Sequence, residues 1–238
     1  MIQIYNGLVS GWEAAVRGMR NPMNSWAKSD STLDVHMNDG YFAASTISKG
    51  RCLAEKIGAA DKDLMLRLSR AGTDHRKFMR MIVVYADITA PLYWWKEFDT
   101  YKVGTVANSC STMHKIHEKE FTLDDFSHEH LNRLSMHELE YTMEYLNIWR
   151  SIYLHGGSYE NERYYEPKDK EAWWQMIQLL PSSYNQKRTV MLNYEVLANI
   201  YKSRKNHKLD EWQDFCKWIE KAPLSELITG EEPAEVSD

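Results

Sequence analysis

The stretch that decides the fold is MIVVYADITAPLYWWKEFDTYKVGTVANSCSTMH, residues 81–114. Alternating β-branched residues predict a strand from about 80 to 89, which the Ala90-Pro91 pair ends. LYWWKEF, residues 92–98, predicts a buried helix or turn. A run of short polar side chains then competes with the backbone for hydrogen bonds, which is typical of a loop. That loop either holds a ligand or simply connects elements; its small side chains are Thr105, Asn108, Ser109, Cys110 and Ser111.

Outward from this stretch, spacing and capping signals predict a mixed α+β domain. The expected elements are a strand at 2–5, a helix at 12–19, a long polar loop at 24–45, a helix that Asp61 caps and Gly72 ends, a long helix at 136–154, a helix at 190–204 and an amphipathic helix at 210–223. We expect one domain over residues 1–228 and a disordered acidic tail at 229–238.

Composition excludes several classes of function. The net charge of -5 and the isoelectric point near 6.0 are unlike those of a protein that binds a nucleic-acid polymer. Cysteines at 52, 110 and 216 form no pattern typical of disulfide frameworks or zinc sites. No apolar run approaches the ~18 residues of a membrane span. The sequence therefore predicts a cytoplasmic protein that acts on a small molecule, away from membranes.

Asn193, Asn199 and Arg204 fall within the helix expected at 190–204. At 100° per residue, Asn193 and Arg204 would lie about 20° apart on one face. One interpretation is a solvated polar face with Arg204 near the negative end of the helix dipole. The other is a site where amides and a guanidinium bind the edges and phosphates of a nucleotide or flavin.

Two further groups of residues have both a functional and an ordinary interpretation. His114 with His117, and His128 with His130, lack the spacing of known zinc motifs, and surface histidines explain them without a metal. Cys110 is either a nucleophile or a small hydrophobic residue. The chain has no GxSxG, GxGxxG or P-loop motif.

In their order and spacing, several segments resemble the flavin-dependent thymidylate synthases from about residue 60 to 219. LMLRLSRAGTDHRKFMR resembles that family's leucine-rich helix and its Gly-His-Thr/Ser end, and MIVVYADITAP resembles the strand and its break. TYKVGTVANSCSTMH occupies the place of the signature RHRxxSxNExSxRY. IQLLP, NYEVLANIYKSRKNH and LDEWQDF resemble the downstream segments, and the N-x5-N-x4-R spacing with which such enzymes hold flavin and nucleotide is kept.

The signature segment departs from the family pattern. Thr100, Tyr101 and Lys102 replace Arg-His-Arg, and Ile177 replaces the arginine that precedes the Leu-Pro pair. Each lost contact between a phosphate and a charged group is worth roughly 1.5 to 3 kcal/mol. We expect other cations to replace these contacts, namely Lys96, Lys102, Arg76, Arg80 and Arg188.

The resemblance implies an antiparallel sheet with packed helices, FAD as cofactor, NADPH and methylenetetrahydrofolate as co-substrates, and a homotetramer. It implies methylation of dUMP to dTMP or a related one-carbon transfer to C5 of a pyrimidine nucleotide. The alternative is a nucleotide-binding protein of the same fold without catalysis. The implied catalytic residues are Arg204 and Ser111; the implied cofactor ligands are His75, Lys102, Thr105, Asn108, Asn193, Asn199 and His207; the implied substrate ligands are Lys96, Glu97, Ser109, Ser111 and Arg204.

Overall fold

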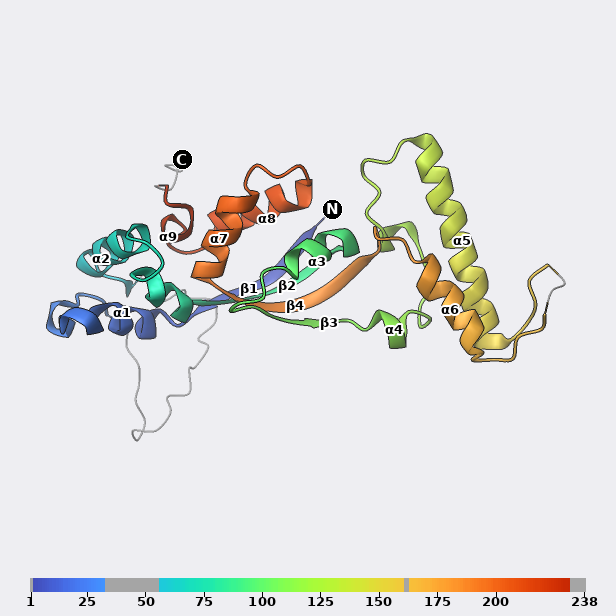
Figure 1. Ribbon diagram of the computed structural model, residues 1–238, viewed down its shortest axis with the longest axis horizontal. Helices are drawn as coiled ribbons and strands as arrows, with labels where there is room; N and C mark the ends of the chain where they lie inside the picture. Colours follow the sequence, from blue (N-terminus) through green and yellow to red (C-terminus); the bar gives the residue numbers. More distant parts are fainter. Residues whose placement is uncertain (1, 33–55, 161–162, 232–238) are drawn as a thin grey trace, which may run out of the picture. The chain divides into compact units, whose positions relative to one another are not determined.

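The computed structural model describes residues 2–32, 56–160 and 163–231. It combines helices with a four-stranded antiparallel sheet, as the sequence predicts (Figure 1). The strand order is β1-β2-β4-β3. The strands are β1 (Gln3–Ser10), β2 (Val83–Pro91), β3 (Val106–Ser109) and β4 (Asn185–Asn193).

The chain forms two compact units, and each of the four strands contains one of the boundaries between them. Unit 1 contains residues 1–3, 88–100 and 108–189, and unit 2 contains residues 4–87, 101–107 and 190–238. The prediction of one domain over residues 1–228 stays a prediction. Of the polar loop expected at 24–45, residues 33–45 lie outside the described residues, as do residues 232–238 of the acidic tail.

Two strands differ from the sequence prediction. The segment at 106–109 was expected to be a loop but is β3, and directly after it the amide of Cys110 donates to the carbonyl of Lys187 at 3.0 Å. Residues 190–193 were expected to begin a helix but end β4, where Val190 and Leu192 are buried at a spacing of two. That alternation is typical of a strand with one buried face and takes precedence over helix propensity.

Unit 2 holds the helices near both ends of the chain. Its elements are α1 (Trp12–Arg20), η1 (Asn21–Met23), η2 (Trp26–Lys28), α2 (Ala59–Arg70), η4 (Arg76–Met81), α7 (Tyr194–Arg204), α8 (Asp210–Glu220) and α9 (Glu226–Thr229). Figure 1 shows α7, α8 and α9, in orange to red, next to one another. In the core, the rings of Trp12 and Tyr194 meet edge to face at 5.3 Å.

Unit 1 contains α3 (Leu92–Phe98), α4 (Thr112–Lys115), η5 (Leu123–Asp125), α5 (Arg133–His155) and α6 (Lys170–Leu179). Trp94, Trp95 and Phe98 of α3 are buried. The Trp94 ring stacks on Phe98 and meets Trp95 edge to face, and of the buried helix or turn expected here the helix forms. The long α5 lies beside α6, and Leu146 and Met176 meet in a shared apolar cluster.

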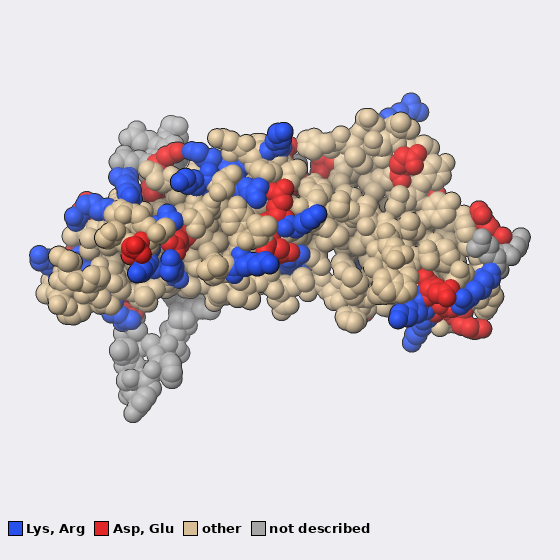
Figure 2. Space-filling view, viewed as in Figure 1, with Lys and Arg blue, Asp and Glu red and all other residues tan. Residues whose placement is uncertain are grey.

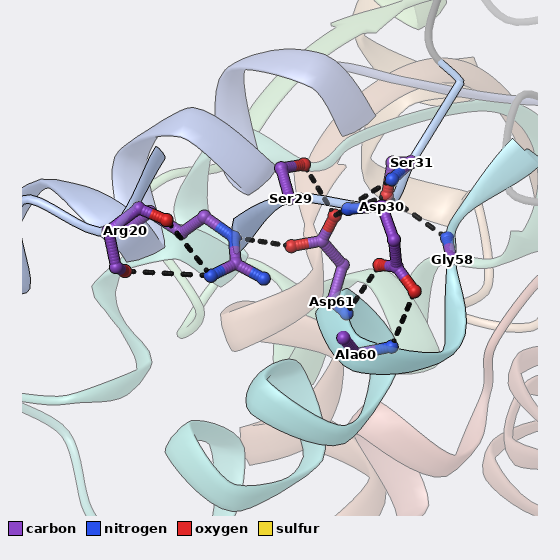
Figure 3. A network of polar contacts seen from close by, with 8 residues as sticks. Arg20, Ser29, Asp30, Ser31, Gly58, Ala60 and Asp61 are labelled. Atoms are coloured by element: carbon purple, nitrogen blue, oxygen red, sulfur yellow. Dashed lines mark hydrogen bonds and ion pairs between the residues drawn. The ribbon is translucent and has the colours of Figure 1, made fainter. Parts of the chain in front are cut away.

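A buried ion pair fixes the start of α2 (Figure 3). Asp61 was expected to cap this helix from outside; instead Gly58 is the N-cap residue, and Asp61 lies in the first turn, fully buried. Its carboxylate accepts from Arg20 Nε at 2.6 Å and from the hydroxyls of Ser29 and Ser31, each at 2.6 Å. The helix amides are capped instead by Asp30, whose carboxylate accepts from Asp61 N at 3.0 Å. This partner is 31 residues away in sequence, so a local pattern could not reveal it.

Candidate functional site

Arg204, the residue expected to be catalytic, lies half-buried among aromatic rings in unit 2. Its Nε donates to the hydroxyl of Tyr101 at 2.9 Å, and its guanidinium carbon lies 4.8 Å from the centre of the Trp212 ring. The His207 ring lies 6.3 Å from the same tryptophan. Arginine stacks favourably on aromatic faces, so these contacts restrict its orientation. Sequence analysis missed Trp212, although the buried stripe of α8 is a signal for it.

Asn193 is the N-cap residue of α7 and does not lie on the face of that helix. Its side-chain oxygen accepts from Val196 N at 3.0 Å, and its Nδ2 donates to the carbonyl of Gly104 at 3.4 Å. It therefore links the start of α7 to the segment that contains Thr105. The Thr105 hydroxyl is buried and lacks a hydrogen-bond partner among the described residues, which is the kind of orphan that a ligand can satisfy.

Asn199 lies five residues before Arg204, so the two side chains project about 140° apart around α7. Arg76 donates to the Asn199 side-chain oxygen at 3.0 Å and to Glu195 at 3.2 Å. Arg80 also donates to Glu195. The shared helix face predicted for Asn193 and Arg204 is therefore wrong, because Asn193 caps the helix instead of lying on one of its faces.

Glu195 is only 7% exposed, and its charge is balanced by the two arginines. Burial alone raises the pKa of this carboxyl, but hydrogen bonds from Arg80 and Arg76 outweigh it and hold the pKa below its usual value. The two arginines expected to be available for anions are thus already paired. In the sequence, Glu195 is the single charged residue of the otherwise apolar segment 194–198, and this pattern could have indicated the cluster. His75, which directly precedes Arg76 in the sequence, is the N-cap residue of η4 and is exposed.

In unit 1, Arg188 is also paired. Its guanidinium lies 4.2 Å from the centre of the Trp95 ring and donates to Asp99 at 2.7 Å and to Gln186 at 2.9 Å. Gln186 in turn donates to the carbonyl of Cys110 at 3.0 Å. Arg188 therefore orders the backbone just before Ser111 and is committed to protein contacts rather than to an anion.

Ser111 lines a cavity of about 450 Å³ in unit 1, together with Cys110 and Tyr184. The Ser111 oxygen accepts from His114 N at 3.2 Å as the cap of α4, which leaves its hydroxyl proton to donate elsewhere. Burial, followed by the negative charge of Asp125, raises the pKa of Tyr184. Cys110 is exposed, so the interpretation as a small buried hydrophobic residue is wrong.

The other predicted residues lie in three places. Lys96 is exposed and Glu97 half-buried on α3, and Lys102 is exposed in the turn after it. Asn108 and Ser109 are exposed in β3. Unit 2 thus contains His75, Lys102, Thr105, Asn193, Asn199, Arg204 and His207, and unit 1 contains Lys96, Glu97, Asn108, Ser109 and Ser111.

Within the described ranges, no three His, Cys, Asp or Glu side chains are grouped as a metal site would need. In the same ranges, no helix is both long enough and apolar enough to cross a bilayer.

Comparison with known proteins gives a match in structure but none in sequence. No protein-family model and no curated protein matches the chain. A structure of thymidylate synthase X (ThyX) from Helicobacter pylori with FAD and dUMP matches with a TM-score of 0.60 and 16% identity, over 97% of this chain and 98% of the other. A second structure, described as flavin-dependent thymidylate synthase ThyX from Helicobacter pylori complexed with FAD and dUMP, matches with a TM-score of 0.61 and 16% identity, over 96% of this chain and 98% of the other. The chain therefore has the fold of the flavin-dependent thymidylate synthases along nearly its whole length.

Proposed function

We propose that the protein binds FAD and a pyrimidine nucleotide and transfers a one-carbon unit to C5 of the base, with dUMP as the substrate and dTMP as the product. The observation that carries this proposal is the shared fold over 97% of the chain with a protein whose structure holds FAD and dUMP. In this proposal methylenetetrahydrofolate supplies the carbon, NADPH the reducing equivalents, and the protein works as a homotetramer in the cytoplasm.

The polar groups of unit 2 fit a flavin nucleotide. The buried Thr105 hydroxyl lacks a partner among the described residues, and a ribose or phosphate oxygen would satisfy it. The Asn199 amide nitrogen and His207 would donate to the flavin ring, since His207 Nδ1 accepts from Leu209 N at 3.2 Å and the neutral ring then carries its proton on Nε2. His75 and Lys102 complete the proposed cofactor ligands of unit 2, and Asn108 of unit 1 is a further proposed ligand. When bound, FAD supplies the electron transfer that no side chain can perform.

Arg204 has the central role among the chain's own residues. Its charge is permanent, and the ring of Trp212 and the hydroxyl of Tyr101 fix its direction. A fixed cation stabilises negative charge that develops on a pyrimidine ring during attack from C5 without having to reorient. Ser111 would donate its hydroxyl proton to the nucleotide, and Lys96, Glu97 and Ser109 would bind the remaining polar groups of the substrate.

One observation favours the second function, nucleotide binding without catalysis. Glu195 neutralises Arg80 and also Arg76, which contacts Asn199, so both cations are already paired. An anionic ligand there would compete with a buried carboxylate.

Release of tritium from C5-tritiated dUMP tests the first function, because substitution at C5 must displace the hydrogen of that carbon. We expect release that depends on FAD, NADPH and methylenetetrahydrofolate and that falls at least about 100-fold in Arg204→Ala, as when a fixed group that stabilises charge is removed. Arg67→Ala is the control, since Arg67 is an exposed arginine of the same unit. Saturable dUMP binding without tritium release would favour the second function, and absence of both would refute the proposal.

A further inference from the structure

A second cavity, of about 260 Å³, lies within unit 2. Its walls come from the end of α2, the start of η4, one face of α7, and α9. On α7, Ala198, Tyr201, Lys202 and Lys205 line it at positions i, i+3, i+4 and i+7, which place side chains on one face of a helix. None of the residues in the proposed flavin and pyrimidine site lines this cavity.

The cavity lining carries four cations and no carboxylate. Arg76 is held by Glu195, and Lys205 contacts Glu231 at 3.1 Å. The other two cations, Arg70 and Lys202, are exposed and make no ion pair or hydrogen bond among the described residues. Figure 2 shows blue side chains gathered over the region of α7 and α9. The cavity therefore has an excess of positive charge that carboxylates of the described residues leave unbalanced.

The rest of the lining is apolar. Leu227 and Ile228 of α9 are buried, and Ala198 and Tyr201 of α7 are less than 10% exposed. Lys205 also lies 5.6 Å from the centre of the Tyr201 ring. Cations above an apolar floor suit a ligand with an anionic end and a compact uncharged body.

We infer that this cavity binds a phosphate group, which is held by Arg70 from the end of α2 and by Lys202 and Lys205 from the end of α7. A phosphate oxygen accepts charge-assisted hydrogen bonds from several cations at once, and separate lysine and arginine side chains can converge on one. The volume lies below the roughly 300 Å³ at which sites for drug-sized ligands begin, so the cavity suits a sugar phosphate, a pyrophosphate or one end of a nucleotide. This inference does not depend on the proposed reaction.

Isothermal titration of the full chain with inorganic pyrophosphate at low ionic strength tests the inference. We expect saturable binding that weakens by about tenfold or more in the double variant Arg70→Ala/Lys202→Ala, since the loss of each hydrogen bond between charged groups lowers the affinity. The control is Lys208→Ala/Lys221→Ala, which removes the same net charge from exposed positions of unit 2 outside this cavity. Its affinity should stay within about twofold of that of the original protein. Absence of pyrophosphate binding, or equal weakening in both double variants, would overturn the inference.

Glu231→Gln provides a second test with the opposite sign. Removal of this carboxylate frees Lys205, so pyrophosphate should bind more tightly, whereas unchanged or weaker binding would contradict the role of Lys205. Competition then identifies the source of the phosphate. Displacement of pyrophosphate by FAD or dUMP assigns the cavity to that nucleotide, and retention assigns it to another phosphorylated compound.

Discussion

Replacement of Asp61 by asparagine should destabilise unit 2 strongly. One carboxylate oxygen accepts from Arg20 Nε, and the other accepts from both serine hydroxyls and from the amides of Asp30 and Ser31, at 3.2 and 3.1 Å. An asparagine has one acceptor oxygen, so it can satisfy one side only and must point its amino group at donors on the other. If that oxygen stays with the serines, Arg20, which is 4% exposed, loses its carboxylate.

Breaking a buried ion pair by removing one partner costs about 3 to 5 kcal/mol. At a slope of ~3 kcal/mol per molar urea, this corresponds to an unfolding midpoint lower by about 1 to 2 M. Asp63→Asn is the control, because Asp63 lies in the same helix but pairs with Arg67 on the surface, where such pairs are worth about 1 kcal/mol or less. Urea titration followed by tryptophan fluorescence measures both variants. Equal midpoints for the two would refute the reasoning.

The same carboxylate gives a pH dependence. Burial alone raises the pKa of Asp61, but hydrogen bonds from Ser29, Ser31 and Arg20, with the charge of that arginine, outweigh it and hold the pKa below the ordinary value of 3.8. Because the pKa is lower in the folded state, the ionised carboxylate contributes its full stabilisation at pH values above 3.8. This contribution is lost as the pH falls through the lowered pKa. The stability gap between the original protein and Asp61→Asn should therefore be constant from pH 5 to 7 and shrink below about pH 4. A gap that grows on acidification would contradict this assignment.

Three other perturbations have defined outcomes. Gly104→Ala should lower stability, measured by thermal unfolding, more than Gly230→Ala. Both glycines have φ near +75°, but only at position 104 would a Cβ lie 2.5 Å from the side-chain amide of the α7 N-cap asparagine. Equal losses would contradict this. Tyr101→Phe should keep the fold and lower dTMP formation about tenfold, since it removes one hydrogen bond to a charged guanidinium; unchanged activity would show that this bond does not position the arginine. Burial raises the pKa of Cys216 to about 11, so Cys216 should resist alkylation by iodoacetamide at pH 8 while the exposed Cys110 reacts. Mass spectrometry of the labelled peptides measures this, and faster labelling of Cys216 would contradict it.

Elements that depend on local pattern were predictable from the sequence. The alternation in β2, the aromatic run of α3 and the amphipathic spacing of α8 each predict the element that forms. β3 was missed because a four-residue edge strand depends on its neighbour β4 for hydrogen bonds. β4 was missed because its apolar end runs directly into α7, so the change of period from 2 to 3.6 is hidden.

The candidate site was predictable only in part. Spacing placed Asn199 and Arg204 in one helix, where the structure also has them, and their roles stay a prediction. It gave Asn193 the wrong setting, since a cap residue and a helix-face residue look alike in sequence. It did not reveal that Tyr101 contacts Arg204 across 103 residues or that Glu195 neutralises two arginines. These pairings depend on tertiary contacts, which local periodicity does not encode.

Titration of the purified full chain with FAD shows directly whether this fold binds a flavin. We expect saturable uptake, with the absorbance bands near ~375 and ~450 nm retained in the protein fraction after gel filtration, as a bound isoalloxazine ring gives. We also expect that Asn199→Ala weakens this uptake while Asn206→Ala, a substitution at an exposed residue just after α7, leaves it unchanged. A protein that stays colourless and takes up no FAD at micromolar concentrations would contradict the proposal.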